Sequence, residues 1–104
     1  MIRSVTNDIT AAASGETLVT FLSGIEGKSR RVTEIRVETT ADMDVRAYLD
    51  QDRIVDVGSE AETNENHPIP VDVEVPLGKA FKAGWQNNTG GGLTAKIVVF
   101  YEET

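Results

Sequence analysis

The feature that most constrains the fold is the alternation of apolar and charged side chains in short segments. The clearest case is VDVEVPL at 71–77, where three valines and Leu77 share one face and Asp72 and Glu74 point to the other. Successive side chains of a β-strand point to opposite sides, so a period of two is typical of a strand with one face in the core. We therefore expect a strand here, with its apolar side buried.

The same period recurs along most of the chain. Besides 71–77, it predicts strands at 17–22, 33–40, 43–49, 53–58, 79–86 and 95–103, with a weaker candidate at 3–13. Glycine, proline and aspartate mark turns between these segments, and no window carries a 3.6-residue apolar stripe. The pattern predicts an all-β fold, an antiparallel two-sheet β-sandwich, and the strand count favours a jelly roll of about eight strands. A single domain is expected over residues 1–104.

Three segments are expected to be connections. SEAETNENHPIP at 59–70 is rich in acids and amides and contains two prolines, so we expect it to cross between the sheets. The glycines 90–92 precede a β-branched run, and we expect them to supply positive φ angles in a hairpin or crossing loop. The basic group KSRR at 28–31 is expected to be a turn with solvated charges.

Charge and composition argue against several partners. The net charge of −7 arises from residues 41–104, which hold twelve acidic and five basic residues. Such a surface repels phosphate backbones, so we expect no nucleic-acid partner. No window approaches the roughly 18 apolar residues of a membrane helix, so we expect no membrane partner. The chain has no cysteine, which excludes disulfides and thiolate metal sites.

Candidate catalytic groups are few. The single histidine, His67, lies in a proline-rich loop, without the Gly-x-Ser-x-Gly motif of a hydrolase. The pairs Asp42 with Asp44 and Asp50 with Asp52 have a spacing that can place two carboxylates on one strand face, for acid–base chemistry or calcium. Aspartates around a single glutamine also fit a hairpin turn. We expect no enzyme activity, no metal and no cofactor, and an enzyme using His67 and these carboxylates is the third hypothesis.

The segment GWQNNTGGG at 84–92 raises two binding hypotheses. A phosphate cradle needs a glycine loop that leads into a helix, and here a β-branched strand follows instead. Alternatively, Trp85, Asn87 and Asn88 would supply a ring and amides to a glycan-binding site. Trp85 also alternates with Phe81 on one face of its strand, which favours a position in the core.

The last strand is apolar on both faces. In AKIVVFYEE at 95–103, Val98 and Phe100 occupy one parity, and the other parity, which ends at Tyr101, is apolar as well. Such a strand needs cover on both sides. We expect Val98 and Phe100, or the opposite set with Tyr101, to contact a neighbouring subunit or a folded-back N-terminus. Tyr48 faces outward in the register expected of its own strand and is a further interface candidate.

The C-terminal part of the chain adds a resemblance. Residues 69–103, IPVDVEVPLGKAFKAGWQNNTGGGLTAKIVVFYEE, combine an alternating strand, a Leu-Gly turn, a strand ending near Trp-x-Asn-Asn, a Gly/Thr loop and a last apolar strand with an acidic end. In this they resemble the closing strands of small single jelly-roll proteins of virus particles, the capsid-decoration, turret and spike-base proteins of tailed bacterial and archaeal viruses. The resemblance implies a homo-oligomer, a trimer or pentamer, at the capsid surface of the virion. It also implies contact with the major capsid protein or another virion protein.

Two functions are therefore expected ahead of the enzyme hypothesis. The first is a non-enzymatic virion structural protein, a decoration or turret subunit acting by protein–protein contacts. The alternative is a carbohydrate-binding β-sandwich module for host attachment, with Trp85, Tyr48 and the amides of Asn87 and Asn88 as its contacts.

Overall fold

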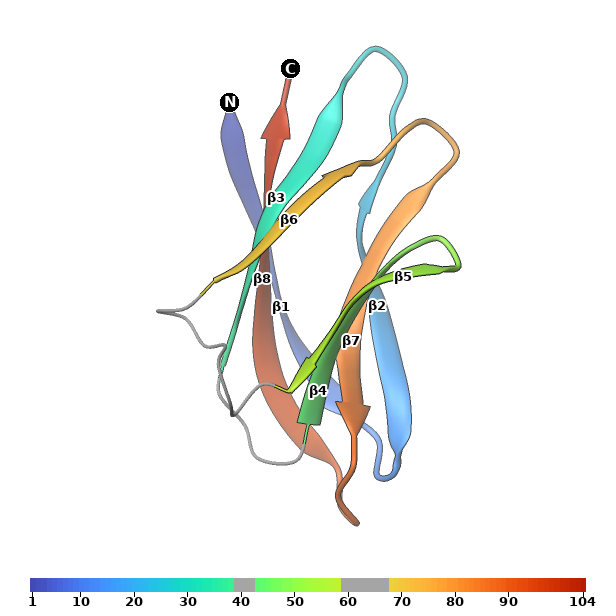
Figure 1. The fold of residues 1–104 in the computed structure, drawn as a ribbon, viewed down its shortest axis with the longest axis vertical. Coiled ribbons are helices and arrows are strands. Elements are labelled where there is room, and N and C mark those ends of the chain that lie inside the picture. Colours follow the sequence, from blue (N-terminus) through green and yellow to red (C-terminus); the bar gives the residue numbers. More distant parts are fainter. Residues whose placement is uncertain (39–42, 59–67) are drawn as a thin grey trace.

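The alternating segments form β-strands in the computed structural model of the chain, which describes residues 1–38, 43–58 and 68–104 (Figure 1). The eight strands are β1 (Ile2–Ala11), β2 (Gly15–Ser23), β3 (Arg30–Val37), β4 (Met43–Leu49), β5 (Asp52–Gly58), β6 (Ile69–Glu74), β7 (Ala80–Asn87) and β8 (Leu93–Glu103). Within the described ranges, no helix is long and apolar enough to cross a membrane.

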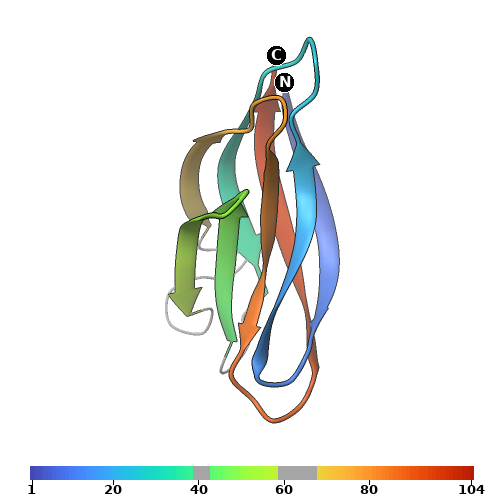
Figure 2. The ribbon, with the colours of Figure 1, turned by 90° about the vertical axis from the view of Figure 1, so that its right-hand side faces the viewer.

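The strands pair antiparallel in two four-stranded sheets. Sheet 1 has the order β1-β8-β3-β6, and sheet 2 has the order β2-β7-β4-β5. The first strand thus pairs with the last, β2 with β7, β3 with β6 and β4 with β5, as if one long hairpin had been rolled up. This is the wiring of a jelly roll. The sheets lie face to face (Figure 2), so the predicted antiparallel two-sheet sandwich is confirmed.

The core fills the space between the sheets. Phe81 and Trp85 on β7 are fully buried, and they face Ile97 and Val99 of the opposite sheet, which are fully buried as well. The Trp85 Nε1 donates to the backbone oxygen of Ala95 at 3.4 Å, which satisfies its polar group inside the core. Further inward residues predicted from the alternation are also buried: Ile35, Val37, Met43, Val45, Ala47 and Ala83.

Strand register is interrupted in three of the four outer strand pairs. The shifts lie between Thr20 and Leu22 (β2–β7), between Val32 and Glu34 (β3–β6) and between Ala47 and Tyr48 (β4–β5). The β1–β8 ladder runs without a shift from Ile2, opposite Glu102, to Ala11, opposite Leu93. Because a bulge bends and twists its strand, the three shifted pairs are bent, whereas the β1–β8 pair is regular.

The prediction of a turn at 28–31 is wrong for residues 30 and 31. β3 already begins at Arg30, so both arginines of KSRR lie in a strand. Arg30 has partners that hold it there. Its Nε donates to Glu103 Oε2 at 2.9 Å, and its guanidinium lies 5.6 Å from the centre of the Tyr101 ring. The hydrogen bond from Arg30 lowers the pKa of Glu103 below its ordinary value.

The boundaries of β6 also differ from the prediction. The strand begins at Ile69 and includes Pro70, because β6 is an edge strand, where a missing N–H is tolerated. It ends at Glu74, before Pro76, so Leu77 is 67 % exposed and not on the buried face. Residues 59–67 of the expected crossing connection lie outside the described residues.

The glycines 90–92 connect sheet 2 to sheet 1 as a crossing loop, but none of them has a positive φ. The loop is shaped instead by side chains. Asn87 Oδ1 accepts from the Thr89 N–H at 2.9 Å, and the Thr89 hydroxyl donates to the Gly91 oxygen at 2.8 Å. Left-handed φ angles occur at other turn residues: Ser14, Gly27, Asp50 and Gly78.

Candidate interaction surfaces

The outer face of sheet 1 carries an apolar strip made of Ile2, Phe100 and Val98. All three alternate with the inward residues of their strands and so point away from the core. The register places Ser4 beside Phe100 and Thr6 beside Val98, and Ile2 lies diagonal to Phe100. Ile2 is 72 % exposed, whereas Val98 and Phe100 are half-buried. The apolar strip is therefore accessible along the β1 side of this face.

Charged side chains frame the apolar strip on the β3 side. The Arg36 Cζ lies 5.2 Å from the centre of the Phe100 ring, and its Nε donates to Glu34 Oε2 at 3.0 Å. Towards β6, Arg31 Nη1 donates to Asp72 Oδ1 at 2.7 Å, a hydrogen bond that raises the pKa of Arg31. An apolar centre with a charged rim is the composition found at protein–protein interfaces.

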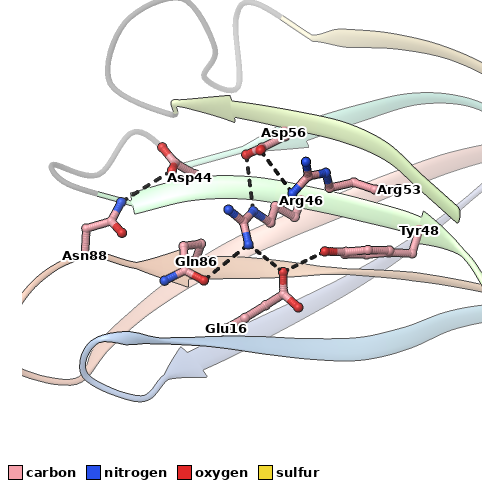
Figure 3. A network of polar contacts seen from close by, with 8 residues as sticks. All are labelled: Glu16, Asp44, Arg46, Tyr48, Arg53, Asp56, Gln86 and Asn88. Atoms are coloured by element: carbon pink, nitrogen blue, oxygen red, sulfur yellow. Dashed lines mark hydrogen bonds and ion pairs between the residues drawn. The ribbon is translucent and has the colours of Figure 1, made fainter. Parts of the chain in front are cut away.

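The outer face of sheet 2 has a different character, because ion pairs cover its centre (Figure 3). Arg46 Nη1 donates to Glu16 Oε2 at 3.0 Å and to Gln86 Oε1 at 3.3 Å, and Arg46 Nε donates to Asp56 Oδ1 at 3.2 Å. The Tyr48 hydroxyl donates to the same Glu16 oxygen at 2.8 Å. We call these five residues, contributed by β2, β4, β5 and β7, the Arg46 network.

Arg46 reaches across β7 to Glu16 on β2, beside the position of Gly84. β7 lies between β4 and β2, and Gly84 is opposite Arg46 on one side and Leu18 on the other. The β2 backbone also closes over this position, since a Cβ at residue 84 would lie 1.8 Å from the Thr17 oxygen. Gly84 is buried although it has the outward parity of its strand. It is thus the position at which the β2 backbone covers β7, beside the Arg46 network.

The pairing sets the ionisation of the Arg46 network. Burial alone would raise the pKa of Glu16, but hydrogen bonds from Arg46 and Tyr48 outweigh it and hold that pKa below its ordinary value of 4.5. The hydrogen bond to Glu16 in turn raises the pKa of Arg46. Asp56 is also paired with Arg53 at 3.4 Å. The charged groups of the Arg46 network therefore already have partners within the chain.

The four predicted interface residues do not share one surface. Val98 and Phe100 lie on the outer face of sheet 1, whereas Tyr48 lies in the Arg46 network on sheet 2. Tyr101 points inward and is 7 % exposed, which leaves little of it for a partner to contact. The N-terminal segment forms β1 beside β8, and so it does not fold back over Phe100.

The three predicted glycan contacts are divided between core and surface. Trp85 and Asn87 have no exposed surface, so a sugar has no access to either. Asn87 is the buried end of β7, and its Nδ2 donates to the Ala11 backbone oxygen at 3.3 Å. Asn88 is exposed, and its Nδ2 donates to Asp44 Oδ2 at 3.3 Å beside the Arg46 network (Figure 3).

The predicted catalytic candidates are partly outside the described residues, where His67 and Asp42 fall. Asp50 and Asp52 flank the β4–β5 turn, as predicted, and Asp50 has a φ of 53°. The Ala80 N–H donates to Asp50 Oδ1 at 2.9 Å, which lowers the pKa of this carboxyl. Among the described residues, no group of three or more His, Cys, Asp or Glu side chains is arranged to hold a metal ion.

Two features of these surfaces were not predicted from the sequence. Ile2 belongs to the apolar strip only through its pairing with β8, and alternation in 3–13 is too weak to place it. The Arg46 network joins four strands, and local periodicity does not give the strand order. A glycine inside an alternating strand, here Gly84, was the available signal, because such a glycine marks close approach of another backbone.

Comparison of the chain with models of protein families, with curated proteins and with solved structures found no match.

Proposed function

We propose that the protein is a non-enzymatic structural subunit of a virus particle, which acts through protein–protein contacts in a homo-oligomer at the capsid surface. The observation that carries the proposal is the apolar strip of Ile2, Phe100 and Val98 on the outer face of sheet 1. The jelly-roll wiring and the resemblance of residues 69–103 to small virion proteins support the viral part.

The strip supplies the driving force for such a contact. Covering apolar surface stabilises a complex by roughly 25 cal/mol for each Å² removed from water. The surrounding charges of Arg36, Glu34, Arg31 and Asp72 lie at the rim, where they orient a partner more than they bind it. The major capsid protein or another virion protein is the second partner in this proposal.

The Arg46 network is less suited to docking. Its ions are paired with one another, so a partner would remove their remaining water without offering better partners. We therefore assign self-association to sheet 1.

The substitution Phe100→Asp tests the contact. It places a charge in the apolar strip, and we expect the mass of the oligomer seen by sedimentation equilibrium to fall while the melting temperature changes by only a few degrees. Thr20→Asp, on the exposed outer face of sheet 2, is the matched control and should keep the oligomer. A monomeric wild-type protein, or a Phe100→Asp variant with unchanged mass, contradicts the proposal.

The viral assignment has a separate test. Genes for a major capsid protein, a portal or a tail beside the gene for this chain would support it, and a neighbourhood without virion genes would argue against it.

A carbohydrate-binding module is the second candidate, favoured by the gathering of Tyr48, Gln86 and the exposed Asn88 on sheet 2. A glycan array tests it. Binding that is lost in Asn88→Ala and in Gln86→Ala would establish this function, and an array without signal would leave the structural role.

A further inference from the structure

The four sheet edges differ in how well they are protected. The edges are β1 and β6 in sheet 1, and β2 and β5 in sheet 2. The pairs that contain β2, β5 and β6 all have register shifts, and β6 also contains Pro70. Bulges and prolines are the devices by which proteins keep edge strands from pairing with other chains. β1 has neither in its 10 residues, of which only Arg3 and Asp8 are charged.

The hydrogen bonds at the start of β1 show which backbone groups point to its free side. The Met1 amino group donates to the backbone oxygen of Glu103 at 3.0 Å, and the Glu103 N–H donates to the backbone oxygen of Met1 at 2.9 Å. Residues of an antiparallel pair alternate between bonded and non-bonded positions, so the odd residues of β1 bond β8. The N–H and C=O groups that point away from β8 belong to Ile2, Ser4, Thr6, Asp8 and Thr10.

The bonds on the other side of β8 agree with this alternation. Ser29 and Thr104 exchange two backbone bonds at 3.0 Å each, and the Glu38 N–H donates to the Lys96 oxygen at 3.1 Å. Even residues of β8 thus bond β3, which leaves its odd residues for β1. Within the part of the chain that the structure describes, β8 is the one strand beside β1.

The side chains show where this edge is open. Ile9 and Ala11 face inward and are buried, but Val5 and Asn7, which have the same parity, are only half-buried. The sandwich is therefore incompletely closed along the first part of β1. A strand laid beside it would cover Val5 and bond the outward amides.

We infer that β1 pairs antiparallel with β1 of a second copy of this chain, so that sheet 1 continues across a two-fold axis. The inference rests on the proposed function for the premise that copies associate, and it adds a second contact between copies, through the β1 edge, to the contact that covers the apolar strip. In a register centred on Thr6, all the backbone N–H and C=O groups that point away from β8 form hydrogen bonds between the two copies. Ile2 of one copy is then opposite Thr10 of the other, and Ser4 is opposite Asp8, so that no like charges face each other. It also brings the apolar strips of the two copies onto one continuous face, because Ile2 lies on β1.

Hydrogen exchange read by NMR tests the pairing on the unmodified protein. At concentrations where sedimentation shows dimers, the amides of Ser4, Thr6 and Asp8 should exchange at least tenfold more slowly than after dilution to monomers. The amides of Val5 and Asn7 bond β8 and should be slow in both states.

The outcomes separate this inference from the proposed function. Oligomers in which the Ser4, Thr6 and Asp8 amides exchange as fast as in the monomer would overturn edge pairing and leave association through the sheet face. A protein that stays monomeric at all concentrations would overturn both.

Variants at one position give an independent test. Thr6→Pro removes an N–H that points to the free edge and should weaken dimerisation at least tenfold, whereas Thr6→Ala should not. Because proline can also disturb β1, Thr6→Lys and Thr6→Glu serve as a second pair. Each alone opposes like charges across the axis and should lose the β1 pairing, and their mixture should regain it as a heterodimer. Wild-type dimerisation by folded Thr6→Pro, or no heterodimer in the mixture, contradicts the inferred pairing.

Discussion

The two outer faces of the sandwich are built from the same alternation but differ in what they leave for a partner. On sheet 1, Phe100 and Val98 lie at the centre, and Arg36 covers only one side of the ring. On sheet 2, Arg46 has three acceptors from its own chain, and Tyr48 adds a fourth hydrogen bond. The first face gains from being covered, and the second has already satisfied its charges internally.

The difference depends on the residues at the middle of each sheet. β8 presents Val98 and Phe100 outward, whereas the corresponding central strand of sheet 2, β7, presents Gly84. A side chain at residue 84 would push the β2 backbone, which carries Glu16, away from β7. The glycine thus keeps Glu16 within reach of Arg46, which pairs charges at the centre of this face.

The largest effect is expected from Gly84→Ala, which disturbs the contact between β2 and β7 in sheet 2. The new Cβ would lie 1.8 Å from the Thr17 oxygen, so β2 must move away from β7. We expect the free energy of unfolding, measured with urea, to fall by about 3 kcal/mol. Val98→Ala at the centre of sheet 1 is the comparison and should cost about 1 kcal/mol, since it removes half-buried methyl groups. Equal losses for the two variants would contradict the role assigned to Gly84.

The next effect compares one arginine from each face. Arg46 is 21 % exposed and has three acceptors, whereas Arg36 is 42 % exposed, has Glu34 as its one ion-pair partner among the described residues and lies over the Phe100 ring. We expect Arg46→Met to lower the free energy of unfolding by about 2 kcal/mol, because its three partly exposed acceptors lose a charged donor. Arg36→Met should lower it by about 1 kcal/mol, about half for the exposed ion pair and about half for the contact with the Phe100 ring. Thermal and urea unfolding measure both, and a larger loss for Arg36→Met would reverse the comparison.

Acid should expose the same difference. The pKa of Glu16 is held below 4.5 by hydrogen bonds from Arg46 and Tyr48, which outweigh the effect of burial. A carboxyl with a lowered folded-state pKa contributes stability that is present above its unfolded value and is lost as the pH falls through the folded one. We therefore expect the urea midpoint of unfolding to decrease as the pH is lowered below about 4.5. In Arg46→Met this midpoint should decrease less steeply with pH than in the wild type. Asp50 and Glu103 also have lowered pKa values and will contribute a decline in both proteins, so the difference between the two curves isolates Glu16.

The sequence was sufficient for the strands because alternation is a local property. It placed seven strands firmly and β1 weakly, since Asn7 and Asp8 interrupt the apolar pattern there. Pairing is not local: nothing within 2–11 indicates that it lies beside β8. The same limit explains Arg30, whose strand position depends on Glu103 at the other end of the chain.

The surfaces were predictable only in part for the same reason. Two apolar parities in β8 gave Val98 and Phe100 as outward candidates, but the choice between them and the set with Tyr101 needed the position of the opposite sheet. The positive φ angles expected at 90–92 do not occur, because the Asn87 side chain shapes the loop. The Asn87 side chain is buried, which could not be predicted because the residues next to it in the sequence are polar.

The smallest effect is expected from Phe100→Leu, and it separates the ring from its apolar area. Leucine keeps much of the apolar surface of the strip but loses the contact with the Arg36 guanidinium 5.2 Å above the ring. An exposed cation–π contact is worth about 0.5 kcal/mol, so the free energy of unfolding should fall by about that amount. A double-mutant cycle with Arg36→Met should return the same coupling energy. Self-association, measured by sedimentation, should stay close to that of the wild type, in contrast to its loss in Phe100→Asp. If Phe100→Leu abolishes association with the fold intact, the partner recognises the Phe100 ring together with the Arg36 guanidinium. The feature that sets the outer face of sheet 1 apart from that of sheet 2 is then this cation–π pair and not the apolar area of the strip.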